Sequence, residues 1–393
     1  MRQTLTISLT SAADSRYNPA MLAGSRFDLI TRFDGSRSNS RGLVYVVLFV
    51  LLAAALELSL SGCAARTPSK EIVMEPLHIE MNKAGMFPPE FWDSAVLMQR
   101  GQRLYDLRKY EEAAELFRRI VDDIPDSDNV EQAKFRLGLC LEALGKCEEA
   151  ARMYDSMATL HRASNPDRDA IFHLGGCREC LNQWQEAADL FEKLLQNRNL
   201  TPSETVQAKC RYAVAIYKLG RIEPATVALK KAIAAYEDLD AKNIRTPGYH
   251  VARAYFHLGE IYLEKARNIQ LCGTDDQMEQ ELKAKAQLSL DARDIYLKAV
   301  RISVPEWATA SMCRIGDAYE DFYHSVMTGP IPTDLEGDDL AEYKAKLDEA
   351  MAPVLSNALF AYRYTVQLAE QFEVNNDWVK ASKEKILLLD IGQ

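Results

Sequence analysis

Cys177 and Cys180 stand two residues apart, a spacing that suits a disulfide, a pair of metal ligands or a redox pair. The sequence has no second pair with this spacing, so it does not supply the four ligands of a structural zinc site. The surrounding pattern is helical, whereas redox pairs of this type are expected beside a strand–helix–strand unit. Small buried cysteines are the favoured interpretation, and a structural disulfide and a catalytic or metal-binding pair are the alternatives.

The other residues with catalytic potential do not form a recognisable constellation. His257 and Glu260 are one helical turn apart and could share a metal ion, but a packed or solvent-facing histidine is the simpler interpretation. The sequence has no glycine-rich phosphate loop and no Gly-x-Ser-x-Gly motif. We therefore expect a protein that is not an enzyme and that has no metal site and no cofactor.

A hydrophobic segment near the N-terminus predicts export. Residues 43–56 read LVYVVLFVLLAAAL and are preceded by Arg37 and Arg41. A bilayer-spanning helix needs about 20 apolar residues, so the short length and the positive flank favour the core of a secretory signal. An uncleaved membrane anchor is the alternative.

The sequence Leu60-Ser61-Gly62-Cys63 follows this segment and resembles the lipobox of bacterial lipoproteins. The resemblance implies that residues 1–62 form a leader, that Cys63 is lipidated, and that residues 63–90 form a flexible tether. Two acyl chains on this cysteine would give stable membrane attachment. The residue after the cysteine is Ala64 and not an aspartate. In this family the absence of an aspartate at this position implies the periplasmic face of the outer membrane.

Three glycines that begin apolar helical runs are 37 residues apart. Each glycine is followed after twelve residues by an alanine, and after a further four by an aromatic residue. A period of this size, with helical spacing inside each unit, predicts an array of helical repeats. The three sets are Gly101, Ala113 and Phe117; Gly138, Ala150 and Tyr154; and Gly175, Ala187 and Phe191.

These units resemble the tetratricopeptide repeat (TPR), a 34-residue helix–turn–helix. The resemblance implies an all-α solenoid, wound as a right-handed superhelix, over residues 91–325. In such a repeat, glycine and alanine let the two helices approach, and the aromatic residue fills the space between one repeat and the next. The predicted units span residues 94–127, 131–164, 168–201, 206–239, 252–304 with an insertion at 271–284, and 309–325 as a half repeat.

The sequence departs from the repeat pattern at two places. In the fifth unit we expect the first helix to run on into the insertion, with a loop at residues 273–276. After residue 325 the sequence predicts a helical C-terminal region, residues 326–393, that caps the solenoid. The order of its proline and aromatic residues resembles the C-terminal region of some bacterial repeat proteins in gliding-motility and envelope complexes.

In this family the concave face is lined by fixed positions of the first helix of each unit, and here those positions combine aromatic and acidic side chains. We expect an acidic, aromatic-lined groove that takes a peptide with apolar anchors and basic residues. The alternative is that Phe135, Phe172 and Phe256 pack between neighbouring helices. The predicted groove residues are Tyr105, Asp106, Phe135, Glu142, Phe172, Glu179, Tyr217, Phe256 and Glu260.

The 393-residue chain has a net charge of −10, which argues against a nucleic-acid partner because phosphate binding needs clustered Lys and Arg. The features together predict a non-enzymatic scaffold that is lipid-anchored in the cell envelope and binds protein partners. Lipobox, tether and repeats are similar in plan to lipoproteins of outer-membrane protein assembly, so we favour that process. The alternatives are a scaffold in a trans-envelope motility or secretion complex and an accessory factor to a cell-wall enzyme.

Overall fold

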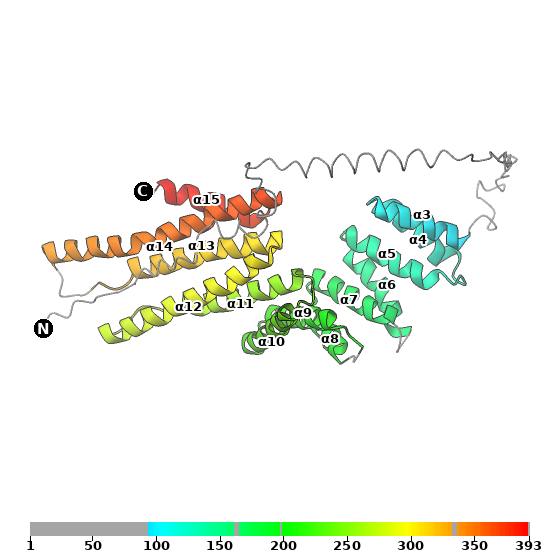
Figure 1. Ribbon diagram of the computed structural model, residues 1–393, viewed down its shortest axis with the longest axis horizontal. Coiled ribbons are helices and arrows are strands. Elements are labelled where there is room, and N and C mark those ends of the chain that lie inside the picture. The colour runs from blue at the N-terminus through cyan, green and yellow to red at the C-terminus, as the bar shows by residue number, and fades with distance from the viewer. Residues whose placement is uncertain (1–92, 161–164, 197–198, 332–335, 392–393) are drawn as a thin grey trace, which may run out of the picture. The chain divides into compact units, whose positions relative to one another are not determined.

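The computed structural model describes residues 93–160, 165–196, 199–331 and 336–391 (Figure 1). Within these ranges the chain forms thirteen helices and no strand, which confirms the predicted all-α fold class. The predicted leader, the lipobox cysteine Cys63 and the tether lie outside the described residues.

The helices α3 to α14 follow one another in six pairs, which we call helix A and helix B of each unit, and α15 comes after the last pair. Their bounds are α3 Ser94–Asp106, α4 Tyr110–Asp123, α5 Val130–Ala143, α6 Cys147–Leu160, α7 Asn165–Cys180, α8 Trp184–Leu195, α9 Pro202–Lys218, α10 Ile222–Ala241, α11 Tyr249–Arg267, α12 Asp275–Ile302, α13 Pro305–Met327, α14 Gly337–Phe372 and α15 Asp377–Ile391.

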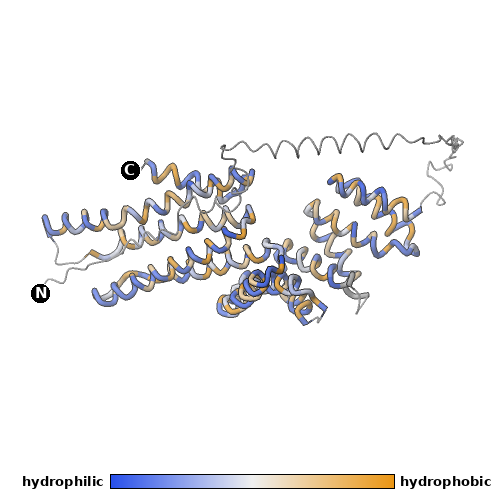
Figure 2. Tube along the Cα trace, in the orientation of Figure 1, coloured by the Kyte–Doolittle hydropathy of each residue, from blue (hydrophilic) through white to orange (hydrophobic). Residues whose placement is uncertain are grey.

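The main helix–helix contacts all join helices that are one or two places apart in chain order. This nearest-neighbour packing is typical of a solenoid, because among the described helices the main contacts do not join distant parts of the chain. Figure 2 shows hydrophobic and hydrophilic residues alternating around each helix, as expected of amphipathic helices. The core is correspondingly divided into a series of hydrophobic clusters along the chain.

A contact between a glycine of helix A and an aromatic ring of helix B recurs in successive units. A Cβ atom added to Gly138 would lie 2.6 Å from Cζ of Tyr154, so only glycine admits the ring there. The ring therefore packs inside its own unit, and it also stacks on His173 of the next unit with ring centroids 5.3 Å apart, so Tyr154 fills the space between units as the sequence predicted. The same contact of glycine and ring pairs Gly101 with Phe117, Gly175 with Phe191, Gly259 with Tyr296 and Gly316 with Tyr362.

The last of these contacts gives the sixth helix A a partner. Gly316 lies in α13 and Tyr362 in α14, so α14 stands to α13 as helix B stands to helix A in the earlier units. The segment predicted as a half repeat therefore has its second helix within the predicted C-terminal region. α15 then packs against both α13 and α14 and covers the end of the sixth unit.

The turn between helix A and helix B keeps one conformation in the first four units. Its residue with a left-handed backbone lies seven positions after the glycine position of helix A. Two of these residues are glycines, which adopt positive φ without strain, and the other two are Arg and Asn. The residues and their φ angles are Arg108 (61°), Gly145 (71°), Asn182 (58°) and Gly220 (74°).

The insertion in the fifth unit lengthens helix B, not helix A as predicted. Helix α11 ends at Arg267, and α12 begins at Asp275 behind a capping box formed by Thr274 and Gln277. The extended helix is fixed to the end of α11 by Lys285, which is buried and donates to the carbonyl oxygens of Ala266 and Ile269 at 2.9 Å each. The last carbonyl oxygens of a helix have no donor within the helix. The Lys285 ammonium supplies donors at this end of α11.

We predict that Gly316→Ala destabilises the protein by about 1–3 kcal/mol, because the added Cβ overlaps the buried ring of Tyr362 and over-packing has this cost. Asn357→Ala, at an exposed position of α14, is the control and should stay within about 0.5 kcal/mol of the parent. Urea unfolding followed by circular dichroism measures both. Equal stability of the two variants would contradict the assignment of α13 and α14 to one unit.

Candidate functional site

Two of the predicted groove aromatics belong to the core. Phe172 in α7 and Phe256 in α11 are only 7% and 4% exposed. Phe256 packs against Trp307 and Trp378 with ring centroids 5.3 and 5.6 Å apart. For these two residues the alternative interpretation, packing between neighbouring helices, is the one that the structure shows.

The other three predicted aromatics are partly exposed. Tyr105 in α3 meets Tyr110 edge to face, with ring centroids 5.3 Å apart. Phe135 in α5 packs against Tyr154 and against His173 of α7, with ring centroids 5.7 and 5.4 Å away, so it lies between neighbouring A helices and keeps only part of its surface open. Tyr217 in α9 contacts a histidine of α11, as described below. Of the predicted groove aromatics, Tyr105 and Phe135 therefore remain partly open to a partner in the first two units.

The carboxylate of Glu179 in α7 is held by two arginines from the following units. Arg211 in α9 places Nε 3.2 Å from Oε1, and Arg253 in α11 places a guanidinium nitrogen 2.6 Å from Oε2. All three side chains are at most 12% exposed. Two charge-assisted bonds therefore satisfy this carboxylate inside the protein.

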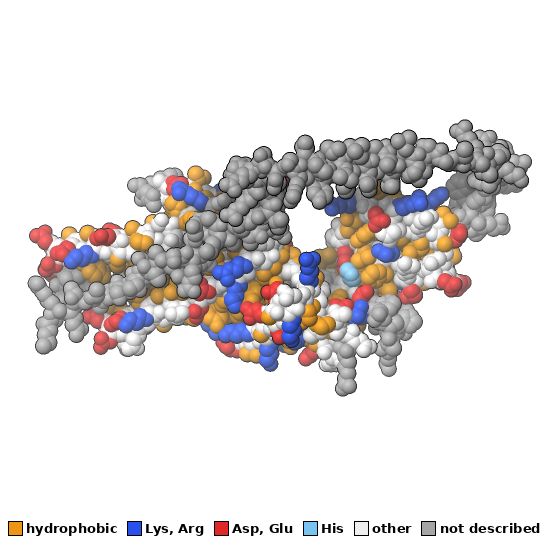
Figure 3. All heavy atoms as spheres, in the orientation of Figure 1, with side chains coloured by type: hydrophobic (Ala, Val, Ile, Leu, Met, Phe, Trp, Pro, Cys, Tyr) orange, Lys and Arg blue, Asp and Glu red, His pale blue; other side chains and the backbone are white. Residues whose placement is uncertain are grey.

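Two further predicted groove carboxylates also have internal partners. Glu142 in α5 accepts from Nδ1 of His173 at 2.9 Å. Glu260 in α11 pairs with Arg314 in α13 at 2.9 Å and accepts from the hydroxyl of Tyr296. Only the carboxylate of Asp106 is on an exposed side chain, where it accepts from a neighbouring glutamine. On the face shown in Figure 3, acidic and basic side chains are interspersed.

The structure therefore corrects the prediction of an acidic groove, because three of the four predicted carboxylates are paired with cationic or imidazole side chains of the protein itself. A basic peptide would have to displace those partners to reach them. Contacts within the protein therefore neutralise most of the negative charge that we expected to attract basic partners.

These contacts follow a register that links successive A helices, and we call the series the inter-unit ladder. In each contact, one residue lies four positions after the glycine position of its own unit. Its partner lies two positions before the glycine position of the next unit. The contacts are Glu142 with His173, Glu179 with Arg211, and Tyr217 with His257, whose ring centroids are 4.9 Å apart. Each contact joins helix A of one unit to helix A of the next.

Arg211 reaches its place in the ladder because Gly176 leaves room for it. A Cβ atom on Gly176 would lie 2.8 Å from a guanidinium nitrogen of Arg211. The guanidinium also donates to the carbonyl oxygen of Phe172 at 3.1 Å and lies 4.5 Å from the ring centroid of Phe191. A planar, fully charged group with several donors suits this combination of carboxylate, carbonyl and ring.

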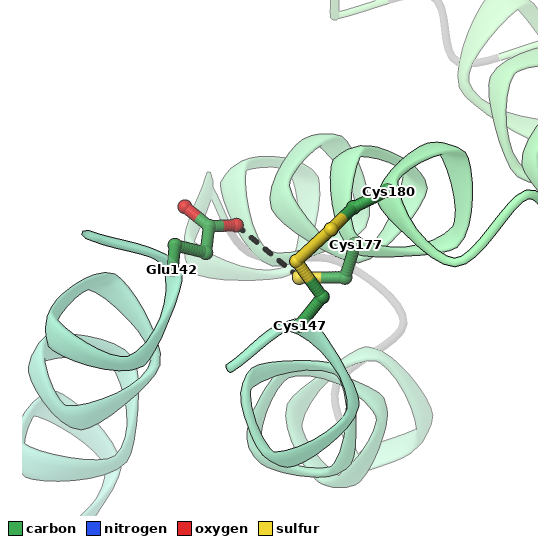
Figure 4. The surroundings of a disulfide bond; sticks show 4 residues. All are labelled: Glu142, Cys147, Cys177 and Cys180. Atoms are coloured by element: carbon green, nitrogen blue, oxygen red, sulfur yellow. Dashed lines mark hydrogen bonds between the residues drawn. A yellow bond between two sulfur atoms is a disulfide. The ribbon is translucent and has the colours of Figure 1, made fainter. Parts of the chain in front are cut away.

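A cavity of about 300 Å³ opens beside this part of the ladder. It lies between the second and third units and is lined by cysteine sulfurs as well as charged groups. A disulfide bond joins Cys147, the first residue of α6, to Cys180, the last residue of α7 (Figure 4). The lining residues are Glu142, Cys147, Phe172, His173, Gly176, Cys177, Cys180 and Arg211.

The two cysteines of the motif, Cys177 and Cys180, thus differ in their bonding. Cys180 is disulfide-bonded to a residue of the preceding unit, whereas Cys177 is a buried free thiol that donates to Oε1 of Glu142 at 3.3 Å. Burial and the nearby Glu142 carboxylate raise the pKa of the Cys177 thiol far above its ordinary value. The favoured interpretation is correct for Cys177 and wrong for Cys180, whose disulfide partner is Cys147.

Metal binding has no support in the part of the chain that the structure describes, where no three potential ligands converge. His257 and Glu260 do not share a site, because Glu260 is engaged by Arg314 and Tyr296. His257 is buried among aromatic rings, and burial lowers its pKa well below the ordinary value. The imidazole is therefore neutral at physiological pH.

Sequence reasoning identified the carboxylates but missed the residues that neutralise them. The signal was present, because a cation or histidine recurs two positions before the glycine position of consecutive units. Its members are Arg136, His173, Arg211, His257 and Arg314. The disulfide had no comparable signal, since Cys147 and Cys180 are 33 residues apart and belong to different units.

Residues 98–167 match the tetratricopeptide repeat family. No curated protein sequence matches the chain. Solved structures that resemble it include MamA residues 41 to the end from Desulfovibrio magneticus RS-1, with 17% identity, 50% of this chain and 92% of that chain covered, and a TM-score of 0.35. The apo form of RapI has 10% identity, 71% and 98% coverage, and a TM-score of 0.44. At these identities the likeness concerns the fold alone.

The described helices form an all-α solenoid, and residues 98–167 within it match the TPR family. Proteins of this class are generally scaffolds for protein–protein interaction, and their partners are proteins or peptides. Among the described residues, no helix combines the length and the apolar character that crossing a bilayer requires.

We predict that Arg211→Met destabilises the protein by about 3 kcal/mol, because Glu179 loses one of its two buried cationic partners and the Phe172 carbonyl loses its donor. Arg221→Met is the matched control, since the Arg221 side chain is exposed and donates to the neutral side chain of Gln185, and its effect should stay within about 0.5 kcal/mol. Denaturant unfolding measures both. A loss for Arg211→Met no larger than the control would show that the ladder does not stabilise the array.

Proposed function

We propose that the protein is a scaffold of the bacterial cell envelope, lipid-anchored through Cys63 at the periplasmic face of the outer membrane. The hydrophobic segment at residues 43–56 and the lipobox-like sequence ending at Cys63 support this proposal. The single structural observation that favours it is the disulfide between Cys147 and Cys180. Disulfides persist in oxidising compartments such as the periplasm and are rare in the cytosol.

We place partner binding on the A helices of the first two units. There Tyr105 and Phe135 are partly exposed and Asp106 is exposed, whereas the predicted groove residues of later units are buried, engaged in the ladder or, for Glu260, paired with Arg314. Arg136 lies two positions before Gly138 on the same helix as Phe135 and forms no ion pair with the described residues. These side chains suit a polypeptide segment with apolar anchors.

The process that we propose is outer-membrane protein assembly. The order of lipobox, tether and repeat array supports it, because that order would tether a solenoid to the membrane and leave the A helices of its first two units available to polypeptide partners.

The double variant Tyr105→Ala, Phe135→Ala should reduce the recovery of partners about tenfold or more in crosslinked co-purification from membranes. Losing about 1.4 kcal/mol of binding energy suffices for this factor, and buried aromatic anchors commonly contribute more. Phe360→Ala is the matched control, because Phe360 is 52% exposed on α14, far along the chain from the proposed surface. If the double variant recovers the same partners as the control, the proposed surface is wrong.

The lipid anchor is tested separately with Cys63→Ser. We expect the variant to move from the membrane fraction to the soluble fraction and to lose the acyl mass at the mature N-terminus, because the thiol that accepts the lipid is gone. Fractionation and mass spectrometry of the N-terminal peptide measure the two effects. Membrane attachment that survives the substitution would favour the uncleaved anchor over the lipoprotein.

A further inference from the structure

Three sulfur atoms line the cavity between the second and third units, and only two of them are bonded to each other. Cys147 and Cys180 form the disulfide, and Cys177, one helical turn before Cys180 in α7, carries a free thiol (Figure 4). We propose that these three cysteines form a thiol–disulfide exchange site in which Cys177 replaces Cys147 as the partner of Cys180. This proposal does not depend on the lipid anchor or on the partner surface.

The positions of the cysteines favour this particular exchange. Residues three apart on a helix have Cβ atoms about 5–6 Å apart. A disulfide needs about 3.5–4.5 Å, so the last turn of α7 must tighten by about 1–2 Å to bring Cys177 and Cys180 within bonding distance. Cys147 is the first residue of α6, where the positive end of the helix dipole stabilises a thiolate. Cys147 is therefore the better leaving group of the bonded pair.

The exchange is balanced without an external oxidant or reductant. The Cys177 thiol, which donates a hydrogen bond to the Glu142 carboxylate at 3.3 Å, first loses its proton to hydroxide from the solvent. The Cys177 sulfur then attacks Sγ of Cys180, a new bond forms between these two sulfurs, and the bond between Cys180 and Cys147 breaks. Cys147 leaves with the electron pair as a thiolate and takes a proton from water, which regenerates the hydroxide.

Glu142 also restrains the reaction. Its negative charge opposes a second negative charge on Cys177, so the thiol stays protonated and the disulfide between units persists. His173 holds the other carboxylate oxygen at 2.9 Å and keeps Glu142 in place. The charged and titratable groups that surround the Cys177 thiol are Glu142 on α5, Cys147 and Tyr154 on α6, His173 and Arg178 on α7, and Arg211 on α9.

The exchange changes what the disulfide connects. Between Cys147 and Cys180 it joins helix B of the second unit to helix A of the third, whereas between Cys177 and Cys180 it lies within α7 alone. The covalent link between the two units is then lost, and the thiol of Cys147 opens to the cavity. The site would thus convert an inter-unit clamp into a reactive thiol next to the ladder.

The test maps the disulfide in the full chain at about pH 8.5, near the ordinary pKa of a cysteine thiol. All variants carry Cys63→Ser and Cys272→Ser, so that neither the lipobox cysteine nor the exposed Cys272 thiol exchanges between molecules. Samples are held without reductant, alkylated at intervals and analysed by peptide mass spectrometry. The compared forms are this parent, Glu142→Gln, Cys177→Ser and, as a matched control at a remote buried thiol, Cys313→Ser.

We expect alkylated Cys147 and the Cys177–Cys180 disulfide to accumulate together in the parent and in Cys313→Ser, and neither to form in Cys177→Ser. Glu142→Gln should speed their appearance about threefold for each unit by which the thiol pKa falls, because the larger thiolate fraction outweighs the weaker nucleophilicity. Serine keeps the hydroxyl donor to Glu142, and Cys177→Ala provides a second variant if folding is impaired. Cys147 that stays unlabelled in the parent and in Glu142→Gln, or is labelled equally in Cys177→Ser, would overturn the proposal.

Discussion

The contact between a glycine of helix A and a ring of helix B is the constraint on which the array depends. It sets how closely the two helices approach, and five units share it through Phe117, Tyr154, Phe191, Tyr296 and Tyr362. The fourth unit shows the same constraint by exception. Ala213 replaces the glycine and Leu229 replaces the ring, and both are fully buried in one cluster. A larger residue on one helix is offset by a smaller one on the other, as dense packing requires.

The glycine–ring contact holds each unit together, whereas the inter-unit ladder joins one unit to the next. Glu179 binds arginines from the two A helices that follow, so its contacts extend across three units. The same contacts decide what the inner positions can offer a partner. Charges that a sequence reading treats as free are used to align the units, and among the predicted groove aromatics Tyr105 and Phe135 of the first two units stay partly exposed outside the ladder. Function and stability therefore compete for the same helix positions.

The cavity between the second and third units is where these features meet. Gly176 lets Arg211 approach, Glu142 accepts from both His173 and the Cys177 thiol, and the disulfide from Cys147 to Cys180 closes one side. A charged group, a thiol and a disulfide thus share one small space. Their chemistry is coupled, because a change at Glu142 alters both the ladder and the protonation of Cys177.

The sequence by itself determined the helical repeats, because the spacing of Gly101, Gly138 and Gly175 and their partners is a local pattern that recurs within each unit. It also placed the aromatic and acidic positions on the A helices. Only the tertiary structure decided which side chains are used internally. Burial of Phe172 and Phe256, the ladder, and the bond between Cys147 and Cys180 depend on residues of different units meeting in space. A repeat pattern describes one unit and its geometry, whereas these contacts arise from how each unit is rotated against the next.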